Sequence, residues 1–307
     1  MKIGYPCINL TIGCQGNKTF RIRSYSEKKF IETVENNLRC LIEILKFNVK
    51  HDLYFFRISS DLIPFASHPV CGFKWERHFA EEFKYIGDFI RQNEIRISMH
   101  PDQFTLINSP DRKIFARSVS ELLYHSKVLD CMGLDSSSKV QIHIGGVYND
   151  KNKSMARFVR RYEKLDARIR NRLVIENDDR LYSLRDCIYI FKETGIPILF
   201  DVFHHETFNS EETLEEAFKL VVRTWRMNDG IPMVDYSSQE DGQRIGKHAR
   251  SIDIEEFRKF IIATRSFDFD VMLEIKDKEK SAIEAVKIAL SDGRFSGDRS
   301  RGEMRYG

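Results

Sequence analysis

The segment Ile198-Leu-Phe-Asp201-Val-Phe-His204-His205-Glu206 changes from apolar to polar within a few residues. Three apolar residues follow Pro197, which is the pattern of a short buried strand in a parallel sheet. In a β/α barrel, the polar residues after such a strand face the mouth that holds the active site. Asp201 and His204 would offer a carboxylate and an imidazole to a divalent metal. Alternatively, Asp201 caps the next helix and the two histidines lie on the surface.

The same succession of an apolar strand and an amphipathic helix recurs along the chain. Strands are predicted at 2–6, 53–58, 95–100, 140–143, 173–176, 198–201, 232–236 and 269–274. The helices between them include a basic helix at 157–169 and a helix at 211–222 that begins at Ser210. Eight strand-then-helix units predict an α/β fold, a single (β/α)8 TIM barrel. We expect one domain over residues 1–292 and a disordered basic tail over 293–307.

Composition limits the function classes. The 307 residues carry 49 Lys and Arg against 46 Asp and Glu, a net charge of +3 that does not by itself argue for a nucleic-acid partner. No apolar run approaches the roughly 20 residues that span a bilayer, and no signal peptide is apparent, so we expect a cytoplasmic protein without membrane contact.

The six cysteines, at positions 7, 14, 40, 71, 131 and 187, form no C-x-x-C pair. That scatter argues against a thiolate zinc site and against a disulfide framework. We therefore expect buried or free thiols in a reducing compartment.

Imidazoles or carboxylates follow seven of the eight predicted strands. They are His68, His100, His143, Glu176, Asp201, His204, Asp235 and Glu274, and His248 lies in the loop after the seventh strand. So many carboxylates in one mouth would repel one another without cations, and His beside carboxylate suits Mn²⁺, Zn²⁺ or Fe. Singly, each residue has an ordinary alternative, such as a loop contact or a pairing with a nearby lysine. Jointly, they predict a metal site.

The chain also resembles the UV damage endonuclease family, which is related in fold to endonuclease IV. The resemblance covers most of positions 1–290. It is carried by Gly4-Tyr5-Pro-Cys-Ile-Asn9-Leu-Thr, Leu62-Ile-Pro-Phe-Ala-Ser-His68-Pro, Ser98-Met-His100-Pro, His143-Ile-Gly-Gly, Glu176-Asn-Asp, Asp201-x-x-His204-His205 and Glu274-x-Lys276. Membership of an archaeal branch is a further hypothesis.

The resemblance implies an enzyme that nicks the phosphodiester backbone immediately 5′ to UV photoproducts, leaving a 3′-hydroxyl and a 5′-phosphate. Its substrates would be double-stranded DNA with cyclobutane pyrimidine dimers, 6-4 photoproducts or abasic sites. It implies two or three divalent ions, with Mn²⁺ expected and Mg²⁺, Co²⁺ or Zn²⁺ as alternatives. We also expect a monomer.

The resemblance also assigns roles to individual residues. The implied metal ligands are His100, His143, Glu176, Asp201, His204, Asp235, His248 and Glu274. The implied catalytic residues are His68, Glu176 and Lys276, and the implied DNA contacts are Tyr5, Asn9, Gln103, Phe104 and Lys247.

Three positions depart from the family pattern. Met233 replaces a lysine that is proposed to be modified, Asp235 replaces a histidine, and Phe104 replaces the tyrosine of a Gln-Tyr pair that fills the gap left by flipped bases. Two other functions remain open at this stage. A sugar isomerase or epimerase of the xylose-isomerase-like barrels uses similar ligands, and a lesion-binding protein could hold metals without catalysis.

Overall fold

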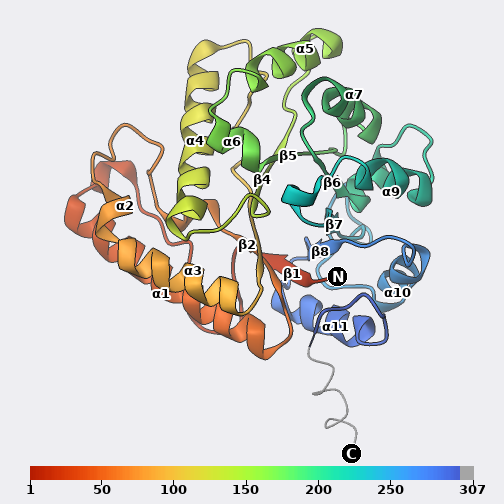
Figure 1. Cartoon of the computed structure of the whole chain (residues 1–307), viewed down its shortest axis with the longest axis horizontal. Helices are drawn as coiled ribbons and strands as arrows, with labels where there is room; N and C mark the ends of the chain where they lie inside the picture. Colours follow the sequence, from red (N-terminus) through yellow and green to blue (C-terminus); the bar gives the residue numbers. More distant parts are fainter. Residues whose placement is uncertain (298–307) are drawn as a thin grey trace, which may run out of the picture.

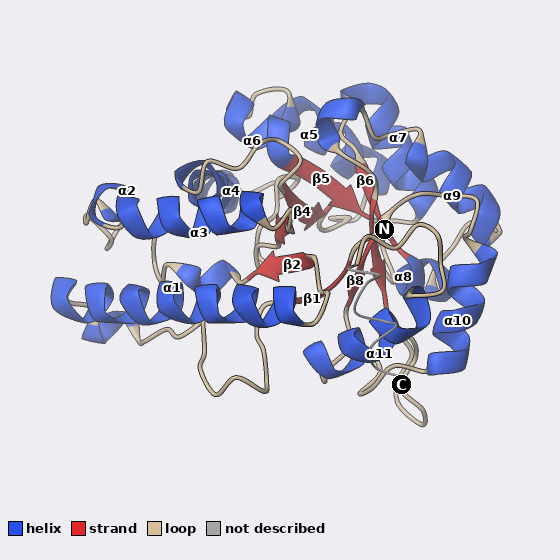
Figure 2. Cartoon of the chain, turned by 60° about the horizontal axis from the view of Figure 1, so that its bottom comes forward, coloured by secondary structure: helices blue, strands red, loops and turns tan. Residues whose placement is uncertain are grey.

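The computed structural model describes residues 1–297, and its eight parallel strands close into one barrel in the order β1 to β8. The strands are β1 Ile3–Pro6, β2 Phe55–Ile58, β3 Arg96–Met99, β4 Lys139–His143, β5 Leu173–Glu176, β6 Ile198–Asp201, β7 Met233–Tyr236 and β8 Asp270–Leu273. Helices surround the strands on the outside (Figure 1, Figure 2). The predicted TIM barrel is therefore confirmed.

The helices follow the strands in chain order. They are α1 Glu27–Lys50, α2 Trp75–His78, α3 Ala80–Gln92, α4 Arg112–Cys131, α5 Lys151–Tyr162, α6 Ala167–Arg172, α7 Leu184–Thr194, α8 Val202–Thr207, α9 Leu214–Val222, α10 Ile254–Ala263 and α11 Glu279–Ala289. Short 3-10 turns lie at Ile22–Ser24, Ser60–Leu62 and Met227–Asp229. Within the described residues, no helix is long and apolar enough to span a membrane.

Side chains alternate along each strand between the helices and the barrel interior. Inside the barrel, Phe55, Val174, Leu199, Met233 and Met272 form a buried apolar cluster, which we call the barrel floor. The residues two positions further along the same strands face the same way, because the side-chain period of a strand is two. A second layer of inward-facing side chains therefore lies directly above the floor, at the carboxyl ends of the strands.

Two predicted helices begin or end elsewhere. The basic helix expected at 157–169 is divided into α5 and α6, because Asp166 starts a new helix by accepting a hydrogen bond from the amide of Arg168. The helix expected from Ser210 begins at Leu214 instead, capped by Thr213. Glu211 has a φ of 75°, which a right-handed helix does not accept, so the chain cannot become helical there.

The prediction that all six cysteines are free or buried thiols is wrong for one pair. Cys14, in the loop after β1, forms a disulfide with Cys40 of α1, with 5.8 Å between their Cα atoms. Cys7, Cys71, Cys131 and Cys187 are free. The two cysteines are 26 residues apart, and no sequence motif identifies them as a pair. The packing of the loop on α1 brings their sulfur atoms together.

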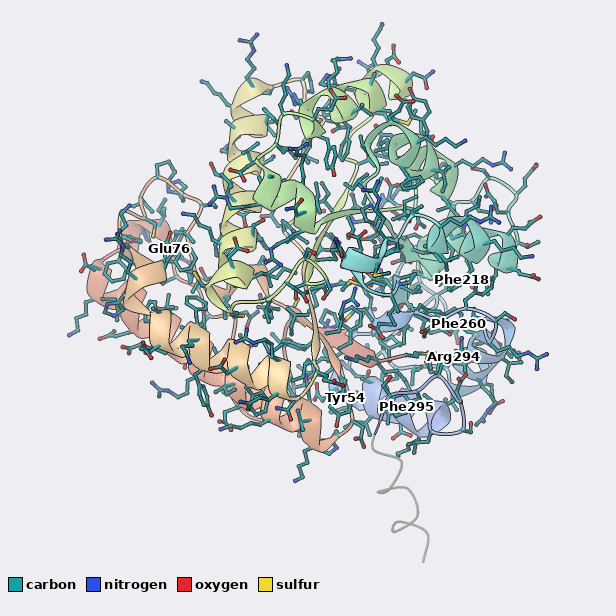
Figure 3. All side chains as sticks on the ribbon, in the orientation of Figure 1. Tyr54, Glu76, Phe218, Phe260, Arg294 and Phe295 are labelled. Carbon is teal, nitrogen blue, oxygen red and sulfur yellow. A yellow bond between two sulfur atoms is a disulfide. The ribbon has the colours of Figure 1, made fainter. Side chains whose placement is uncertain are left out.

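Part of the predicted tail is folded onto the barrel. Arg294 donates to the carbonyl oxygens of Thr264 and Phe267, each at 2.7 Å, and Phe295 is buried. Figure 3 shows both residues beside the end of the barrel, near Phe260 of α10. The disorder expected from 293 onward does not hold for 293–297, and 298–307 lies outside the described residues.

Candidate metal centre

Three groups of side chains at the carboxyl ends of the strands could each hold a metal ion. They are His100, His143 and Glu176; Glu176, Asp201 and His204; and Asp201, Asp235 and Glu274. Within each group the ligand atoms lie within 4.8 Å of one another. Two carboxylates are shared between groups, so the three form one continuous centre across the mouth of the barrel.

Glu176 is the residue on which the histidines converge. Its Oε2 lies 3.6 Å from Nε2 of His100 and 4.0 Å from Nε2 of His143, and its Oε1 lies 3.3 Å from Nδ1 of His204. Burial alone would raise the pKa of Glu176, but the three imidazoles outweigh it and hold the pKa well below its usual range. Glu176 is therefore anionic and shared by two of the groups.

Asp201 caps α8, as one interpretation of the sequence predicted, but His204 and His205 are buried and do not lie on the surface. Its Oδ1 caps α8 by accepting a hydrogen bond from the amide of His204 at 2.7 Å. Its Oδ2 is buried without a hydrogen-bond partner and lies 3.3 Å from Nδ1 of His204. Burial raises the pKa of Asp201 well above its usual range, opposed by His204 and reinforced by Glu176. A buried carboxylate oxygen without a hydrogen bond costs free energy that a bound cation would recover, so the carboxylates and imidazoles present fit a metal ion.

Four imidazoles form a row across the mouth. Ring centroids are 5.5 Å apart between His100 and His143, and 5.9 Å apart both between His143 and His204 and between His204 and His248. Burial lowers the pKa of His204, but Asp201 and Glu176 raise it to about 11. Neutral imidazole is the form that binds a metal, so an ion bound by His204 would release a proton.

Arg57 of β2 is the residue that sequence reasoning missed. It is 2% exposed, and its Nη2 donates to Oδ1 of Asp235 at 2.7 Å and to Oδ2 at 2.6 Å. Its Nη1 donates to Glu274. One signal was available: a charged residue in the middle of the apolar segment Phe55–Ile58 must find a charged partner inside the barrel.

The acidic partners of Arg57 differ in their electrostatics. Burial raises the pKa of Glu274, yet Arg57, His248 and His100 together outweigh burial and bring the pKa to about 2. Burial raises the pKa of Asp235 to about 7, against the opposing effect of Arg57. Met233 lies in the barrel floor one layer below and belongs to none of the three groups in the described part of the chain.

An open cavity of about 600 Å³ lies above the centre, lined by His100, His143, His248, Glu274 and Lys276, among others. Lys276 is partly exposed at its rim, and its ammonium group lies 3.5 Å from Glu240. Gln103 also lines this cavity.

Phe104 and His68 lie beside a second cavity. This cavity of about 520 Å³ is lined by both residues together with Ser67 and Glu121. Phe104 is 72% exposed, so it is not tucked into the core. His68 is exposed and is in none of the three ligand groups of the described residues. Its Nδ1 accepts a hydrogen bond from the amide of Val70 at 3.1 Å, and its expected catalytic role stays a prediction.

Tyr5 and Asn9, expected to contact DNA, are buried instead. The Tyr5 hydroxyl donates to Oδ1 of Asn48 at 2.6 Å and accepts from Nδ2 of Asn9 at 2.9 Å. Tyr5 faces α1 because it lies on the outer side of β1, where it packs edge-on against Phe56. Both side chains therefore hold the loop after β1 in place, and their expected contact with DNA stays a prediction.

Lys247 and His248 lie in a hairpin-like loop after β7. Gln239 and His248 pair as an antiparallel bridge at its base. The Gln239 side chain donates to the carbonyl oxygens of Glu240 and Arg244 and accepts from the amide of Gly246. Lys247 donates to Gln243 at 2.6 Å. We call residues 239–248 the β7 hairpin.

Carboxylates and imidazoles at the carboxyl ends of barrel strands define the class: a TIM-barrel enzyme whose mouth could bind divalent metal ions. Its family follows from comparison with known sequences. The model of the family described as UV-endonuclease UvdE matches residues 1–306. The chain belongs to the UV-endonuclease UvdE family and is an endonuclease with DNA as its substrate.

Relatives and solved structures agree with this assignment. The UV DNA damage endonuclease of Clostridium perfringens is 38% identical over 93% of this chain and 70% of its own length. That of Bacillus cereus is 32% identical over 94% of each chain. The crystal structure of SacUVDE superposes with a TM-score of 0.90 and 45% identity over 94% of this chain and 98% of that one.

More distant structures share the fold alone. Endonuclease IV from Thermus thermophilus has a TM-score of 0.55 at 13% identity, covering 81% of this chain and 93% of its own. D-psicose 3-epimerase from Clostridium cellulolyticum has a TM-score of 0.54 at 12% identity, covering 82% and 92%. The alternative of a sugar isomerase or epimerase is not favoured by the family.

Proposed function

We propose that this endonuclease nicks double-stranded DNA immediately 5′ to UV photoproducts by metal-dependent hydrolysis. The observation that carries the proposal is the continuous set of ligand groups around Glu176, in a chain that matches SacUVDE over nearly its whole length. In the reaction, the oxygen of a water molecule bonds to phosphorus and the P–O3′ bond breaks. The 3′ oxygen takes up a proton, which leaves a 3′-hydroxyl and a 5′-phosphate.

Two or three divalent ions, Mn²⁺ in the first instance, would be held by the histidines and carboxylates of the centre. When bound, such ions neutralise phosphate charge and lower the pKa of water. His100, His143 and Glu176 would hold one ion, and Glu176, Asp201 and His204 a second. Ligands fixed on strand ends keep a rigid geometry, and positioning of this kind supplies much of the rate enhancement in hydrolysis.

The rim residues would grip the DNA. Lys276 pairs with Glu240 in an exposed ion pair, which contributes little and can be exchanged for a phosphate contact. Phe104 offers an exposed ring beside Gln103, and unstacking costs only a few kcal/mol at a damaged step. Lys247 lies in the β7 hairpin next to the candidate ligand His248. We extend the proposal to a monomer acting in the cytoplasm.

A nicking assay tests the proposal. Purified protein is mixed with an end-labelled duplex, irradiated or undamaged, in Mn²⁺ or EDTA. We expect a Mn²⁺-dependent cut immediately 5′ to the lesion, absent in EDTA and on undamaged DNA. A folded, metal-loaded protein that leaves irradiated DNA uncut would refute the proposal.

A further inference from the structure

The buried guanidinium of Arg57 lies among the carboxylates that were expected to bind metal. Arg57 comes from β2, and its partners Asp235 and Glu274 come from the ends of β7 and β8. The side chains of Arg57 and Asp235 are 3% and 0% exposed. A cation in this position persists only because neighbouring carboxylates balance its charge. The third ligand group therefore already contains a positive charge that belongs to the chain.

The oxygens of Asp235 are engaged by protein donors. Both accept from Arg57, and Oδ2 also accepts from Nε2 of Gln141 at 2.9 Å. The same Gln141 nitrogen donates to Oε2 of Glu176 at 2.9 Å, so Gln141 links Asp235 to the shared carboxylate. A carboxylate oxygen has two lone pairs, and those of Oδ2 are both used.

Asp201 is the natural comparison, because it is the Cα partner of Asp235 in the pairing of β6 with β7. The two aspartates have the same side chain, lie in the same layer and are both fully buried. Oδ2 of Asp201 has no hydrogen bond and lies 3.3 Å from Nδ1 of His204, which is itself a candidate metal ligand. Oδ2 of Asp235 instead accepts two hydrogen bonds, from Arg57 and Gln141, and neither of these side chains is a candidate ligand.

We propose that Asp235 is not a metal ligand but the anionic half of a buried pair that fixes Arg57. Arg57 is then a positioning residue: it supplies the positive charge of the third ligand group and holds Glu274 at the mouth. This assignment rests on the proposed metal-dependent function. It restricts the ions to the two groups that share Glu176, with His248 as a neighbouring imidazole.

Metal counting on matched variants tests the assignment without DNA. Wild type, Asp201→Asn and Asp235→Asn are loaded with Mn²⁺, desalted and analysed for manganese per chain. We expect Asp201→Asn to lose one ion and Asp235→Asn to retain the wild-type count. An Asp235→Asn protein that loses an ion as Asp201→Asn does would overturn the assignment.

Variants of Arg57 give a readout that a merely structural role would not move. Arg57→Gln leaves Asp235 and Glu274 without their cation, so we expect it to bind one ion more than wild type. Arg57→Lys keeps the charge and should keep the wild-type count. Equal counts in the glutamine and lysine variants would contradict a charge-supplying role for Arg57.

A thermal cycle covers the case in which single variants fold poorly, and it is measured in EDTA. Asp235→Asn leaves the buried charge of Arg57 without this partner, and Arg57→Gln leaves that of Asp235 without its partner. We therefore expect each variant to lower Tm strongly. The double variant removes both charges and should recover much of that loss. Additive losses in Tm would show that the two residues do not act as a pair. The nicking assay on wild type is separate, so failure of the proposed function is distinguishable from failure of this assignment.

Discussion

Two layers of the barrel interior come from the same strands and differ completely in chemistry. The barrel floor is apolar, and the layer two residues further along is charged. The paired positions are Phe55 and Arg57, Val174 and Glu176, Leu199 and Asp201, Met233 and Asp235, and Met272 and Glu274. The two layers therefore have different roles. The floor supplies apolar packing and excludes water, and the low dielectric constant that results strengthens the electrostatic interactions of the charged layer above it.

The largest effect should come from the shared carboxylate of the charged layer. Glu176→Gln keeps the side-chain shape but removes the charge on which two ligand groups depend. We expect nicking to fall by about 10³-fold or more, equivalent to about 4 kcal/mol, with the fold retained. The measurement is the nicking rate on irradiated duplex. Glu284→Gln, at a partly exposed glutamate of α11 paired with Lys287, is the matched control and should nick as wild type does.

A substitution in the barrel floor should lower stability and leave metal binding intact. Leu199→Ala removes buried methyl groups below Asp201, and we expect a loss of about 2–5 kcal/mol in the free energy of unfolding. Denaturant titration measures this loss. At a temperature where the variant is folded, manganese binding should persist, and loss of all bound manganese there would break the separation between the layers.

Metal should stabilise the folded chain through the charged layer alone. At a Mn²⁺ concentration a hundred times the dissociation constant, we expect about 2.7 kcal/mol of added stability per independent site. Thermal unfolding with and without EDTA measures it. Asp201→Asn should reduce this increment and Leu199→Ala should leave it unchanged. An increment of the same size in both variants would argue that the ions bind elsewhere.

The smallest effect is expected at Met233. Met233→Leu conserves volume in the floor and should cost less than about 1.5 kcal/mol. Because Met233 belongs to no ligand group in the described part of the chain, the manganese count should not change. A lower count would place the floor within the metal site.

The barrel was predictable because its signal is local. Each apolar run ends in a turn or a polar residue, and the eight runs alternate with helical patterns. Convergence of His100, His143 and Glu176 then follows from topology, since the carboxyl ends of parallel strands meet at one face. The family resemblance added function, which the barrel alone does not specify.

What the sequence could not reveal depends on distant partners. Arg57 and Asp235 are 178 positions apart, so their pairing needs the closed barrel. The position of Tyr5 in the sequence predicts a residue at the mouth of the barrel. Its side chain instead lies on the outer side of β1, where the hydroxyl donates to Asn48. The Cys14–Cys40 bond and the true start of α9 likewise depend on how a loop packs or turns.

The β7 hairpin has a consequence for the thermodynamics of docking. One side chain, that of Gln239, already holds the carbonyl oxygens and an amide of the loop in place. A loop ordered in this way has little conformational entropy left to lose when a ligand arrives. Little of the binding free energy from contacts of Lys247 would therefore be spent on ordering the loop. The Gln239→Ala variant should bind its ligand more weakly, although it loses no direct contact with that ligand.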